Sequence, residues 1–336
     1  MGSRNLTPEP ILVLTRQEIA ALMNFDDYVT AVEAAFRLYE EGKALSPGIL
    51  DIASQDGAFH IKAAGLQLQR TYIAVKVNGN FTQNRNRFGL PTIQGAITLC
   101  DGTTGSPLAF MDSIEITSNR TGAATAVAAK YLARPDSTSA TICGCGAQGK
   151  MQLIALQHVL PLERAFAFDL NEETARAFAT QMTAALKLAV TPVSNLRAAA
   201  QDSDVIVTCT TSRKHFLSRD DIKPGTFVAA VGADSHDKQE LDPYLMAANK
   251  VVVDILEQCA AIGDLHHALA QGILSKADVH AELGEVVAGR KPGRTSDDEI
   301  IILDTTGTAL QDVAAAAAIY ERAKRAGIGY ECNLAG

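Results

Sequence analysis

The chain has 336 residues, of which 47% are hydrophobic and 20% are charged, and this is enough apolar material for two domains with cores. Its net charge of −8 argues against nucleic acid or an anionic membrane surface as a partner. No apolar run approaches the roughly 20 residues that a membrane-spanning helix needs, and residues 1–10 lack the pattern of a signal peptide. The six cysteines are scattered, as is typical of reduced thiols, so a cytoplasmic protein is expected.

The first third of the chain predicts a mixed α+β domain. Two helices are expected, at 16–23 and 25–41, and the second has apolar residues at helical spacing. Short strands follow without the alternation of a parallel sheet, and the last two flank a hairpin loop at 101–105. Residues 84–87 are expected to form a polar loop, and residues 116–132 an alanine-rich helix that lies at the domain boundary. The expected strands are 49–53, 58–64, 72–77, 92–100 and 107–111.

From residue 138 onward, strands and helices alternate. The strand expected at 139–143 runs into Gly144-x-Gly146-x-x-Gly149 and then into a helical pattern, which is the context of a dinucleotide site. Gly144 allows the tight turn, Gly146 lets the pyrophosphate approach the backbone, and Gly149 lets the helix pack closely. The fold class expected is α/β: a Rossmann-type doubly wound NAD domain plus the α+β domain. Further strands are expected at 164–169, 188–192, 204–209, 226–231, 250–254 and 299–304.

Asp169 strengthens the prediction of a dinucleotide site. It ends the second strand, 20 residues after Gly149, where a carboxylate accepts hydrogen bonds from the adenosine ribose. Leu170 and Asn171 follow it and no arginine is near, so NAD is favoured over NADP. The alternative is that Asp169 only caps the next helix.

Three charged residues stand out because their neighbours are apolar or small. Lys76 lies inside an expected strand, Arg120 lies near the start of the alanine-rich helix, and Asp234 follows an apolar strand. The carboxyl ends of parallel strands are where open α/β sheets bind ligands. Each residue also has a structural interpretation: an outward-facing lysine, an ion pair at a helix end, and a helix cap. The histidines and acids at 264–267 and 280–282 lack the spacing of metal ligands, so no metal is expected.

Several stretches together resemble the ornithine cyclodeaminase/mu-crystallin family, over residues 70–320. This resemblance implies a homodimer in which residues 1–120 and 313–336 form a substrate-binding and dimerisation domain. Residues 121–312 would then form the NAD-binding domain. The stretches that carry the resemblance are 76–78, 89–95, 116–124, 144–148, 232–234 with 238–241, and 304–312.

The resemblance also implies an activity. It indicates an NAD(P)(H)-dependent oxidoreductase that interconverts an amine or L-amino acid with its imine or oxo acid, as imine reductases and amino-acid dehydrogenases do. One alternative is a cyclodeaminase, a lyase that converts ornithine to proline and ammonia with NAD used catalytically. Another is a non-catalytic, mu-crystallin-like protein that binds cofactor and a small ligand.

Residue roles follow from positions within the family motifs. Asp234 matches the catalytic acid/base, and Lys76 and Arg120 match the cations that face a substrate carboxylate, with Lys76 a second catalytic candidate. Thr92 matches a threonine that lines the site. The expected cofactor-binding residues are Gly144, Gly146, Ala147, Gln148, Gly149 and Asp169, with Thr208, Thr210 and Thr306 toward the nicotinamide.

The sequence departs from the family at one position of the carboxylate site. Relatives that act on amino acids usually have Pro-Arg after the second helix, whereas this chain has Ser46-Pro47-Gly48. Lys62 is a candidate to replace the missing arginine, and its alternative is a solvated strand lysine. If neither residue supplies the charge, a simple amine or imine becomes a candidate substrate.

Overall fold

The computed structural model describes residues 10–334, so most of the expectation for residues 1–10 lies outside the described residues. The chain divides into two compact units. Unit 1 comprises the residues up to Arg120 and those from Thr308 onward, and unit 2 comprises Thr121–Gly307. The chain returns from unit 2 to unit 1 between Gly307 and Thr308, five residues before the predicted boundary at 312/313. The reason is that helix α12 (Ala309–Ala326), which belongs to unit 1, begins there with Thr308 as its N-cap.

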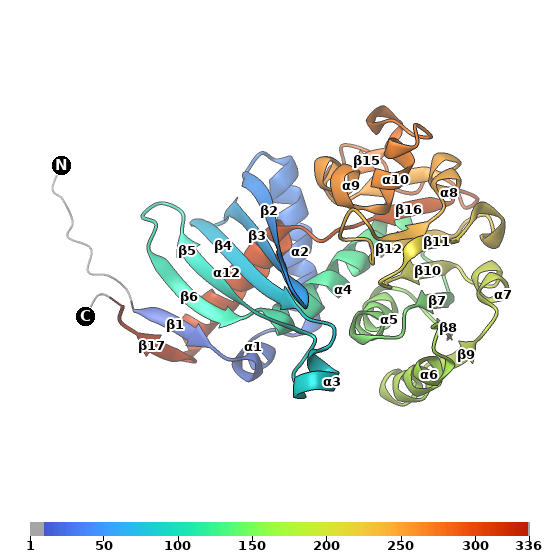
Figure 1. The fold of residues 1–336 in the computed structure, drawn as a ribbon. Coiled ribbons are helices and arrows are strands. Elements are labelled where there is room, and N and C mark those ends of the chain that lie inside the picture. The colour runs from blue at the N-terminus through green and yellow to red at the C-terminus, as the bar shows by residue number, and fades with distance from the viewer. Residues whose placement is uncertain (1–9, 335–336) are drawn as a thin grey trace. The chain divides into compact units, whose positions relative to one another are not determined.

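Unit 1 is built on a seven-stranded sheet in the order β17-β1-β6-β5-β4-β3-β2 (Figure 1). The neighbours pair antiparallel, except β1 and β6, which are parallel. Strands β2 to β6 and the β5–β6 hairpin confirm the prediction, whereas the short strands β1 and β17, next to each other at the opposite edge from β2, were not predicted. The strands are β1 (Ile11–Leu14), β2 (Ala44–Ser54), β3 (Gly57–Gln67), β4 (Thr71–Asn80), β5 (Ile93–Asp101), β6 (Pro107–Asp112) and β17 (Tyr330–Cys332).

Helices cover one face of this sheet. Helix α12 packs on β2 to β5 and against α2, and the paired residues Ala64 and Ala74 lie buried on β3 and β4. The polar loop expected at 84–87 is wrong: those residues belong to a short helix that ends at Gly89 in the left-handed conformation, with φ 67°. The helices of this unit are α1 (Arg16–Leu22), α2 (Phe25–Glu40), α3 (Asn84–Phe88) and α12, together with the first part of α4 (Ser113–Leu132).

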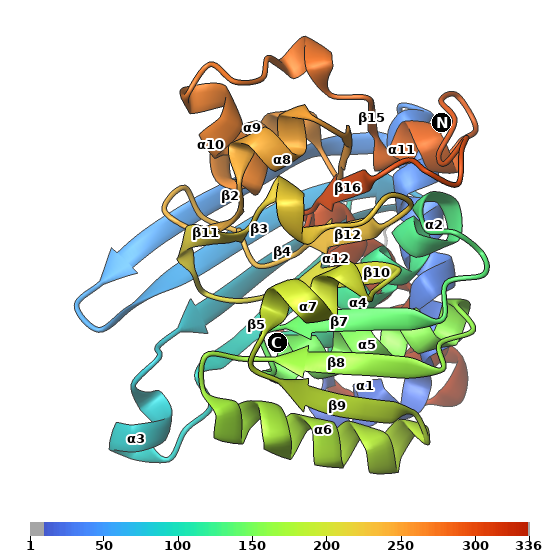
Figure 2. The ribbon, with the colours of Figure 1, turned by 90° about the vertical axis from the view of Figure 1, so that its right-hand side faces the viewer.

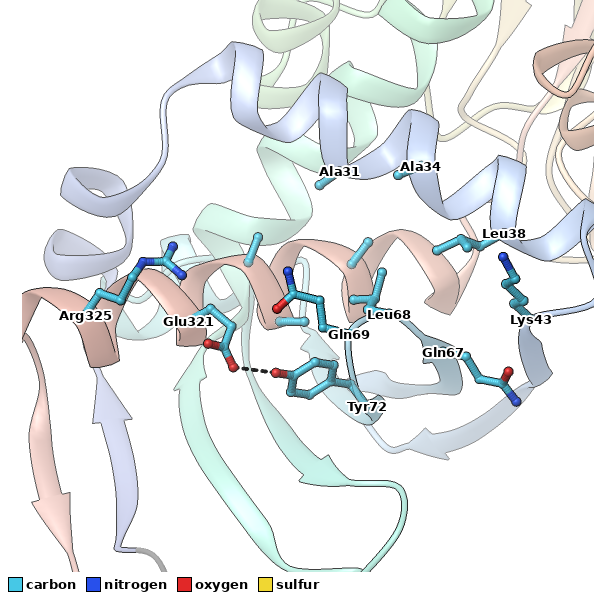
Figure 3. A pocket seen from close by; sticks show the side chains of 13 residues that line it. Ala31, Ala34, Leu38, Lys43, Gln67, Leu68, Gln69, Tyr72, Glu321 and Arg325 are labelled. Carbon is cyan, nitrogen blue, oxygen red and sulfur yellow. Dashed lines mark hydrogen bonds between the residues drawn. The ribbon is translucent and has the colours of Figure 1, made fainter.

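A hollow of about 490 Å³ lies between α2 and α12, beside the turn that joins β3 to β4 (Figure 3). Alanines of both helices line it together with longer polar side chains, among them Tyr72, whose hydroxyl donates a hydrogen bond to the Glu321 carboxylate. None of the charged residues singled out in the sequence lines it. Its lining includes Ala31, Ala34, Leu38, Lys43, Leu68, Ala314 and Arg325.

Unit 2 is a doubly wound α/β domain, as predicted. Its eight-stranded sheet has the order β15-β14-β16-β12-β10-β7-β8-β9, and every pair is parallel. Figure 2 shows β7, β8 and β9 running in the same direction. The strands are β7 (Ser139–Cys143), β8 (Arg164–Phe168), β9 (Ala189–Val193), β10 (Val205–Thr208), β12 (Phe227–Ala230), β14 (Lys250–Val253), β15 (Ala281–Glu282) and β16 (Ile301–Asp304).

The central strands of this sheet are buried on both faces. Every residue of β7, β10, β12 and β16 is buried, which is why their sequences are near-continuous apolar runs. A separate parallel pair, β11 (Arg213–Leu217) and β13 (Gln239–Leu241), was not predicted. The helices are the rest of α4 with α5 (Ala147–Val159), α6 (Glu172–Leu186), α7 (Leu196–Gln201), α8 (Pro243–Ala247), α9 (Leu256–Ile262), α10 (Asp264–Ala270) and α11 (Leu283–Val287).

Among the described residues, none of the helices combines the length and the apolar composition that crossing a membrane requires.

Candidate functional site

The glycine turn of unit 2 shows three different environments at its three glycines. Gly144 has φ +99°, a conformation that other residues rarely adopt. A Cβ atom added at Gly149 would lie 2.1 Å from the carbonyl oxygen of Gly144, so α5 can pack this closely on the turn only with glycine there. A Cβ atom added at Gly146 would meet no atom within 4 Å. The first and third glycines therefore serve the fold, while the second leaves the backbone open to a ligand.

Helix α5 begins directly after this turn, with Ala147 and Gln148 as its first two residues. Gly146 is the N-cap, and no side chain caps the first N–H groups of the helix. These amides, at the positive end of the helix dipole, suit a negatively charged group. The turn and the helix start together fit the pyrophosphate of a dinucleotide.

Asp169 is held against the glycine turn. Its Oδ2 accepts a hydrogen bond from the backbone N–H of Cys145 at 3.0 Å, and its Oδ1 accepts one from the N–H of Asn171 at 2.9 Å. The alternative that Asp169 caps the next helix is wrong, because the Asn171 side chain caps α6. The carboxylate thus lies at the carboxyl end of β8, beside the turn, where the ribose of a dinucleotide is bound in this fold.

The strand order of unit 2 reverses at β7, with β8 and β9 on one side and β10, β12 and β16 on the other. Thr208 is the buried last residue of β10, and the Thr210 hydroxyl accepts a hydrogen bond from the N–H of Ser212. Thr306 follows β16, and its hydroxyl accepts a hydrogen bond from Gln258 Nε2 at 2.6 Å. All three threonines therefore lie at the carboxyl edge of the sheet, where a doubly wound fold binds its ligand.

A buried glutamate ties two of these strand ends together. Glu240 accepts hydrogen bonds from the N–H of Thr210 at 2.6 Å and from the N–H of Gly232 at 2.9 Å. Burial raises the pKa of Glu240, and these hydrogen bonds oppose the shift. Glu240 thereby fixes the loops after β10 and β12, and the second of these loops carries Asp234.

Two more buried carboxyl groups, those of Asp264 and Asp304, are linked to Glu240 by hydrogen bonds to the backbone. Asp264 Oδ1 accepts from the N–H groups of Glu240 and Leu241, and Asp304 accepts from the N–H groups of Asp264 and Leu265. Burial, with Glu240 nearby, raises the pKa of Asp264 to about 7, and burial raises that of Asp304 well above its usual range. No role was predicted for Glu240 or Asp304, and Asp264 was considered only among the residues at 264–267 that lack the spacing of metal ligands.

Asp234 lies on an exposed loop after β12. Its Oδ1 accepts a hydrogen bond from Lys238 Nζ at 2.5 Å, and the carboxylate side chain is 49% exposed. Asp234 caps no helix, so that interpretation is wrong. It is a solvent-accessible carboxylate with a cationic neighbour.

Unit 1 contains a buried cluster of charges. Lys76 Nζ lies 2.6 Å from Asp312 Oδ2, and Arg120 Nε donates to Asp312 Oδ1 at 3.0 Å. The three side chains are 4%, 6% and 1% exposed, respectively. The interpretation of Lys76 as an outward-facing lysine is therefore wrong. Arg120 does form an ion pair, with Asp312, but it lies inside α4 rather than at a helix end, and the pair is buried.

Lys62 lies next to this cluster. It pairs with Lys76 across β3 and β4, so both side chains leave the same face of the sheet. Gly48 pairs with Ala63 instead, one position away from this row, and a Cβ added at Gly48 would meet no atom within 4 Å. Thr92 lies in the bend before β5, where its carbonyl accepts a hydrogen bond from the N–H of Phe81.

The histidines considered as metal ligands bind backbone carbonyl groups. His266 and His267 lie 3.2 and 2.8 Å from the carbonyls of Ala260 and Lys238, and His280 lies 2.9 Å from that of Pro292. Within residues 10–334 there is no group of three histidine, cysteine or acidic residues that could hold a metal ion.

The sequence pattern alone assigns no role to Gln311 and Asp312. The signal available was a carboxylate directly before the apolar run 313–319 of a helix. A charged residue on such a helix needs a buried partner, and only the structure identifies Lys76 and Arg120 as those partners.

The fold, the glycine turn with Asp169 in unit 2, and the charged cluster in unit 1 are typical of an enzyme with a Rossmann-type dinucleotide domain. The model of the ornithine cyclodeaminase/mu-crystallin family matches residues 10–327, and the chain belongs to this family. An alanine dehydrogenase from Archaeoglobus fulgidus is 40% identical over 319 residues, which is 95% of this chain and 97% of that protein.

Solved structures agree with this assignment. An archaeal alanine dehydrogenase dimer with bound NAD is 38% identical, covering 96% of this chain and 99% of that one, with a TM-score of 0.91. The Δ1-pyrroline-2-carboxylate reductase of Thermococcus litoralis, in complex with NADH and L-proline, is 34% identical over 96% and 100%, with a TM-score of 0.90. The iminosuccinate reductase of Paracoccus denitrificans with NAD+ is 33% identical over 97% and 100%, with a TM-score of 0.89.

Proposed function

We propose that the protein is an NAD-dependent oxidoreductase that interconverts an α-amino acid with its imino or oxo acid. The observation that carries this proposal is the glycine turn, whose open Gly146 and uncapped α5 suit a pyrophosphate. The similar proteins described above act, by their names, on alanine, iminosuccinate and Δ1-pyrroline-2-carboxylate. Each of these compounds carries a carboxylate on the carbon that bears the nitrogen.

Unit 2 holds the cofactor in this proposal. The amides at the start of α5 bind the pyrophosphate, and Asp169 accepts hydrogen bonds from the adenosine ribose. A second phosphate on that ribose would face the Asp169 carboxylate with only Leu170 and Asn171 after it, which favours NAD over NADP. When bound, the cofactor supplies hydride exchange at the carbon bound to nitrogen. Thr208, Thr210 and Thr306 lie toward the nicotinamide.

Unit 1 binds the substrate carboxylate in this proposal. Lys76 and Arg120 are two buried cations that share one buried counterion, Asp312, so the cluster carries an excess of positive charge. A carboxylate is the ligand that satisfies such an excess, and a guanidinium can bind it through two hydrogen bonds. Lys62 adds a third cation in the row of Lys76, which compensates for the arginine that relatives carry at the position of Gly48. This charge favours an amino or imino acid over a simple amine.

Asp234 moves the proton in this proposal. A carboxylate near the substrate nitrogen accepts a proton from the amine in one direction and returns it to the imine in the other. Glu240 fixes the loop before Asp234 through the N–H of Gly232, and Lys238 holds one of the Asp234 oxygens. Both contacts restrict where the carboxylate can lie, which matters because proton transfer requires hydrogen-bond distance.

NADH absorbance followed with pyruvate plus ammonia, oxaloacetate plus ammonia, Δ1-pyrroline-2-carboxylate and the corresponding amino acids tests the proposal. Asp234→Asn is expected to lower kcat at least a hundredfold while NADH still binds, because general acid–base catalysis contributes about 10²–10⁴. Asp237→Asn is the matched control, since Asp237 lies three residues away and pairs with Arg213 and Ser235. No turnover with any of these substrates in either direction would contradict the proposal.

The same assay separates the two alternatives within the family. Proline and ammonia formed from ornithine without a net change in NADH would indicate a cyclodeaminase. If Asp234→Asn left every measured activity intact, the non-catalytic, mu-crystallin-like protein that binds cofactor and a small ligand would be favoured.

A homodimer is also proposed, through the face of the unit 1 sheet opposite to Lys76. The strand register brings Leu50 beside Ile61 and Val77, and Ile52 beside Phe59. Leu50, Ile52 and Phe59 are 56%, 48% and 39% exposed, and an exposed apolar surface of this kind marks an interface. A second copy of the same sheet is a partner of matching chemistry. A monomer in analytical ultracentrifugation at micromolar concentration would refute this proposal.

A further inference from the structure

Asp312 lies between the two buried cations of unit 1. One of its oxygens accepts from Arg120 Nε, and the other lies 2.6 Å from Lys76 Nζ. The neighbouring Gln311 accepts a hydrogen bond from Arg120 Nη1 at 2.8 Å. Arg120 therefore uses its Nε and Nη1 groups in these contacts, while Nη2 takes part in neither.

The N-cap of α12 positions Asp312 between Arg120 and Lys76. The Thr308 side chain caps the helix by accepting from the N–H of Leu310, so Gln311 and Asp312 lie in the first turns. A carboxylate near the N-terminus of a helix is stabilised by the helix dipole. The charges around Asp312, namely Arg120, Lys76 and Lys62, lower its pKa against the effect of burial, so it is ionised.

Lys76 depends on a counterion more than Arg120 does, because an ammonium group can lose its proton. The pKa of Lys76 is lowered to about 7, and burial is the largest cause, followed by the nearby charges of Arg120 from α4 and Lys62 from β3. Asp312 from α12 is the group that opposes them. The next row of the same sheet face carries His60, which pairs with Asp51 of β2 at 2.7 Å.

We propose that Asp312 is a positioning residue for the carboxylate site: it fixes the Arg120 guanidinium by its Nε edge and keeps the Lys76 ammonium protonated, so that both act on the substrate as cations. The inference rests on the carboxylate site of the proposed function but does not depend on turnover. A purely structural Asp312 would hold the helix and sheet together without changing how binding depends on pH.

The test measures binding of propionate, a carboxylate without a reactive nitrogen, to the full-length protein with NAD+ by ligand-observed NMR between pH 5 and 9. If binding needs protonated Lys76, affinity falls about tenfold from pH 6 to pH 8 in the wild type. In Asp312→Asn the midpoint is expected to move to lower pH by about one to three units, as loss of an adjacent opposite charge does. Propionate at pH 7 then binds at least about fivefold more weakly.

Asp27→Asn is the matched control. Asp27 also pairs with an arginine of α12, Arg322, but it belongs to α2 and makes no contact with Lys76. Its substitution is expected to leave the pH midpoint unchanged. An Asp312→Asn midpoint equal to that of the wild type, or tighter binding throughout, overturns the proposal.

If Asp312→Asn does not fold, the pH dependence of propionate binding is compared between the wild type and Lys76→Met instead. Propionate affinity that stays constant from pH 6 to pH 9 refutes the proposal, since Lys76 then contributes no titrating charge. A fall centred near pH 7 that is absent in Lys76→Met supports it. Propionate binding of this kind without any turnover of imino or amino acids would instead reject the proposed oxidoreductase activity and leave Asp312 in its role.

Discussion

The glycine turn allows the demands of the fold and of the cofactor to be tested separately. At Gly149 an alanine Cβ would lie 2.1 Å from the Gly144 carbonyl oxygen, about 1 Å closer than Cβ atoms normally approach. The backbone of the turn must therefore shift, and overpacking of this kind costs about 1–3 kcal/mol. Replacing glycine inside a helix returns up to about 1 kcal/mol. We therefore expect Gly149→Ala to lower the free energy of unfolding by about 1–2 kcal/mol.

Gly146→Ala should have the opposite profile. Its Cβ meets no protein atom, and φ is −82°, which alanine adopts without strain, so the protein without cofactor should lose less than about 1 kcal/mol. The methyl group would stand where the pyrophosphate approaches the backbone, so NADH affinity should fall at least about tenfold.

Thermal unfolding with and without NADH measures both effects. Gly149→Ala is expected to lower Tm without cofactor by about 2–8 °C. Gly146→Ala should keep the wild-type Tm without cofactor but lose most of the upward shift that saturating NADH produces, since that shift follows the dissociation constant. A Gly146→Ala variant that binds NADH normally would refute the assignment of this turn to the pyrophosphate. Equal destabilisation by the two variants would refute the division of roles.

Two further substitutions test other parts of unit 2. Asp169→Ala should raise the dissociation constant for NADH about tenfold or more, measured by fluorescence titration, because the ribose loses its acceptor; an unchanged constant would remove this assignment. Asp264 has a raised pKa, so the folded state binds a proton more tightly than the unfolded state and stability falls as pH rises from about 4 to 7. Asp264→Asn should flatten that fall in urea unfolding, and an equally steep dependence in the variant would contradict the assignment.

The sequence was most informative where local patterns decide the structure. The near-continuous apolar runs of β7, β10, β12 and β16 are typical of strands buried on both faces, and they therefore predicted a parallel sheet. Gly144 and Gly149 are required by backbone geometry, which is local as well. The short outer strands β1 and β17 were not predictable in this way, because they pair with each other from opposite ends of the chain.

The candidate site could be predicted only in part, because its residues interact with partners that lie far away in the sequence. Lys76 and Arg120 stood out because apolar neighbours surround them, but their counterion comes from α12, 192 positions after Arg120. The acids Glu240, Asp264 and Asp304 interact through backbone N–H groups, which leave no signature in side-chain spacing. Pairings of this kind are set by the tertiary structure rather than by sequence pattern.

The two crossings of the chain between the units have a consequence for biosynthesis. Unit 2 is one continuous stretch, whereas unit 1 needs the residues from Thr308 onward. At about 5–20 residues per second, a ribosome reaches Asp312 roughly 10–40 s after Arg120. During that interval the nascent sheet lacks both α12 and the carboxylate that neutralises its buried cations. The cofactor domain can therefore finish folding while the substrate domain still waits for the last part of the chain to leave the ribosome.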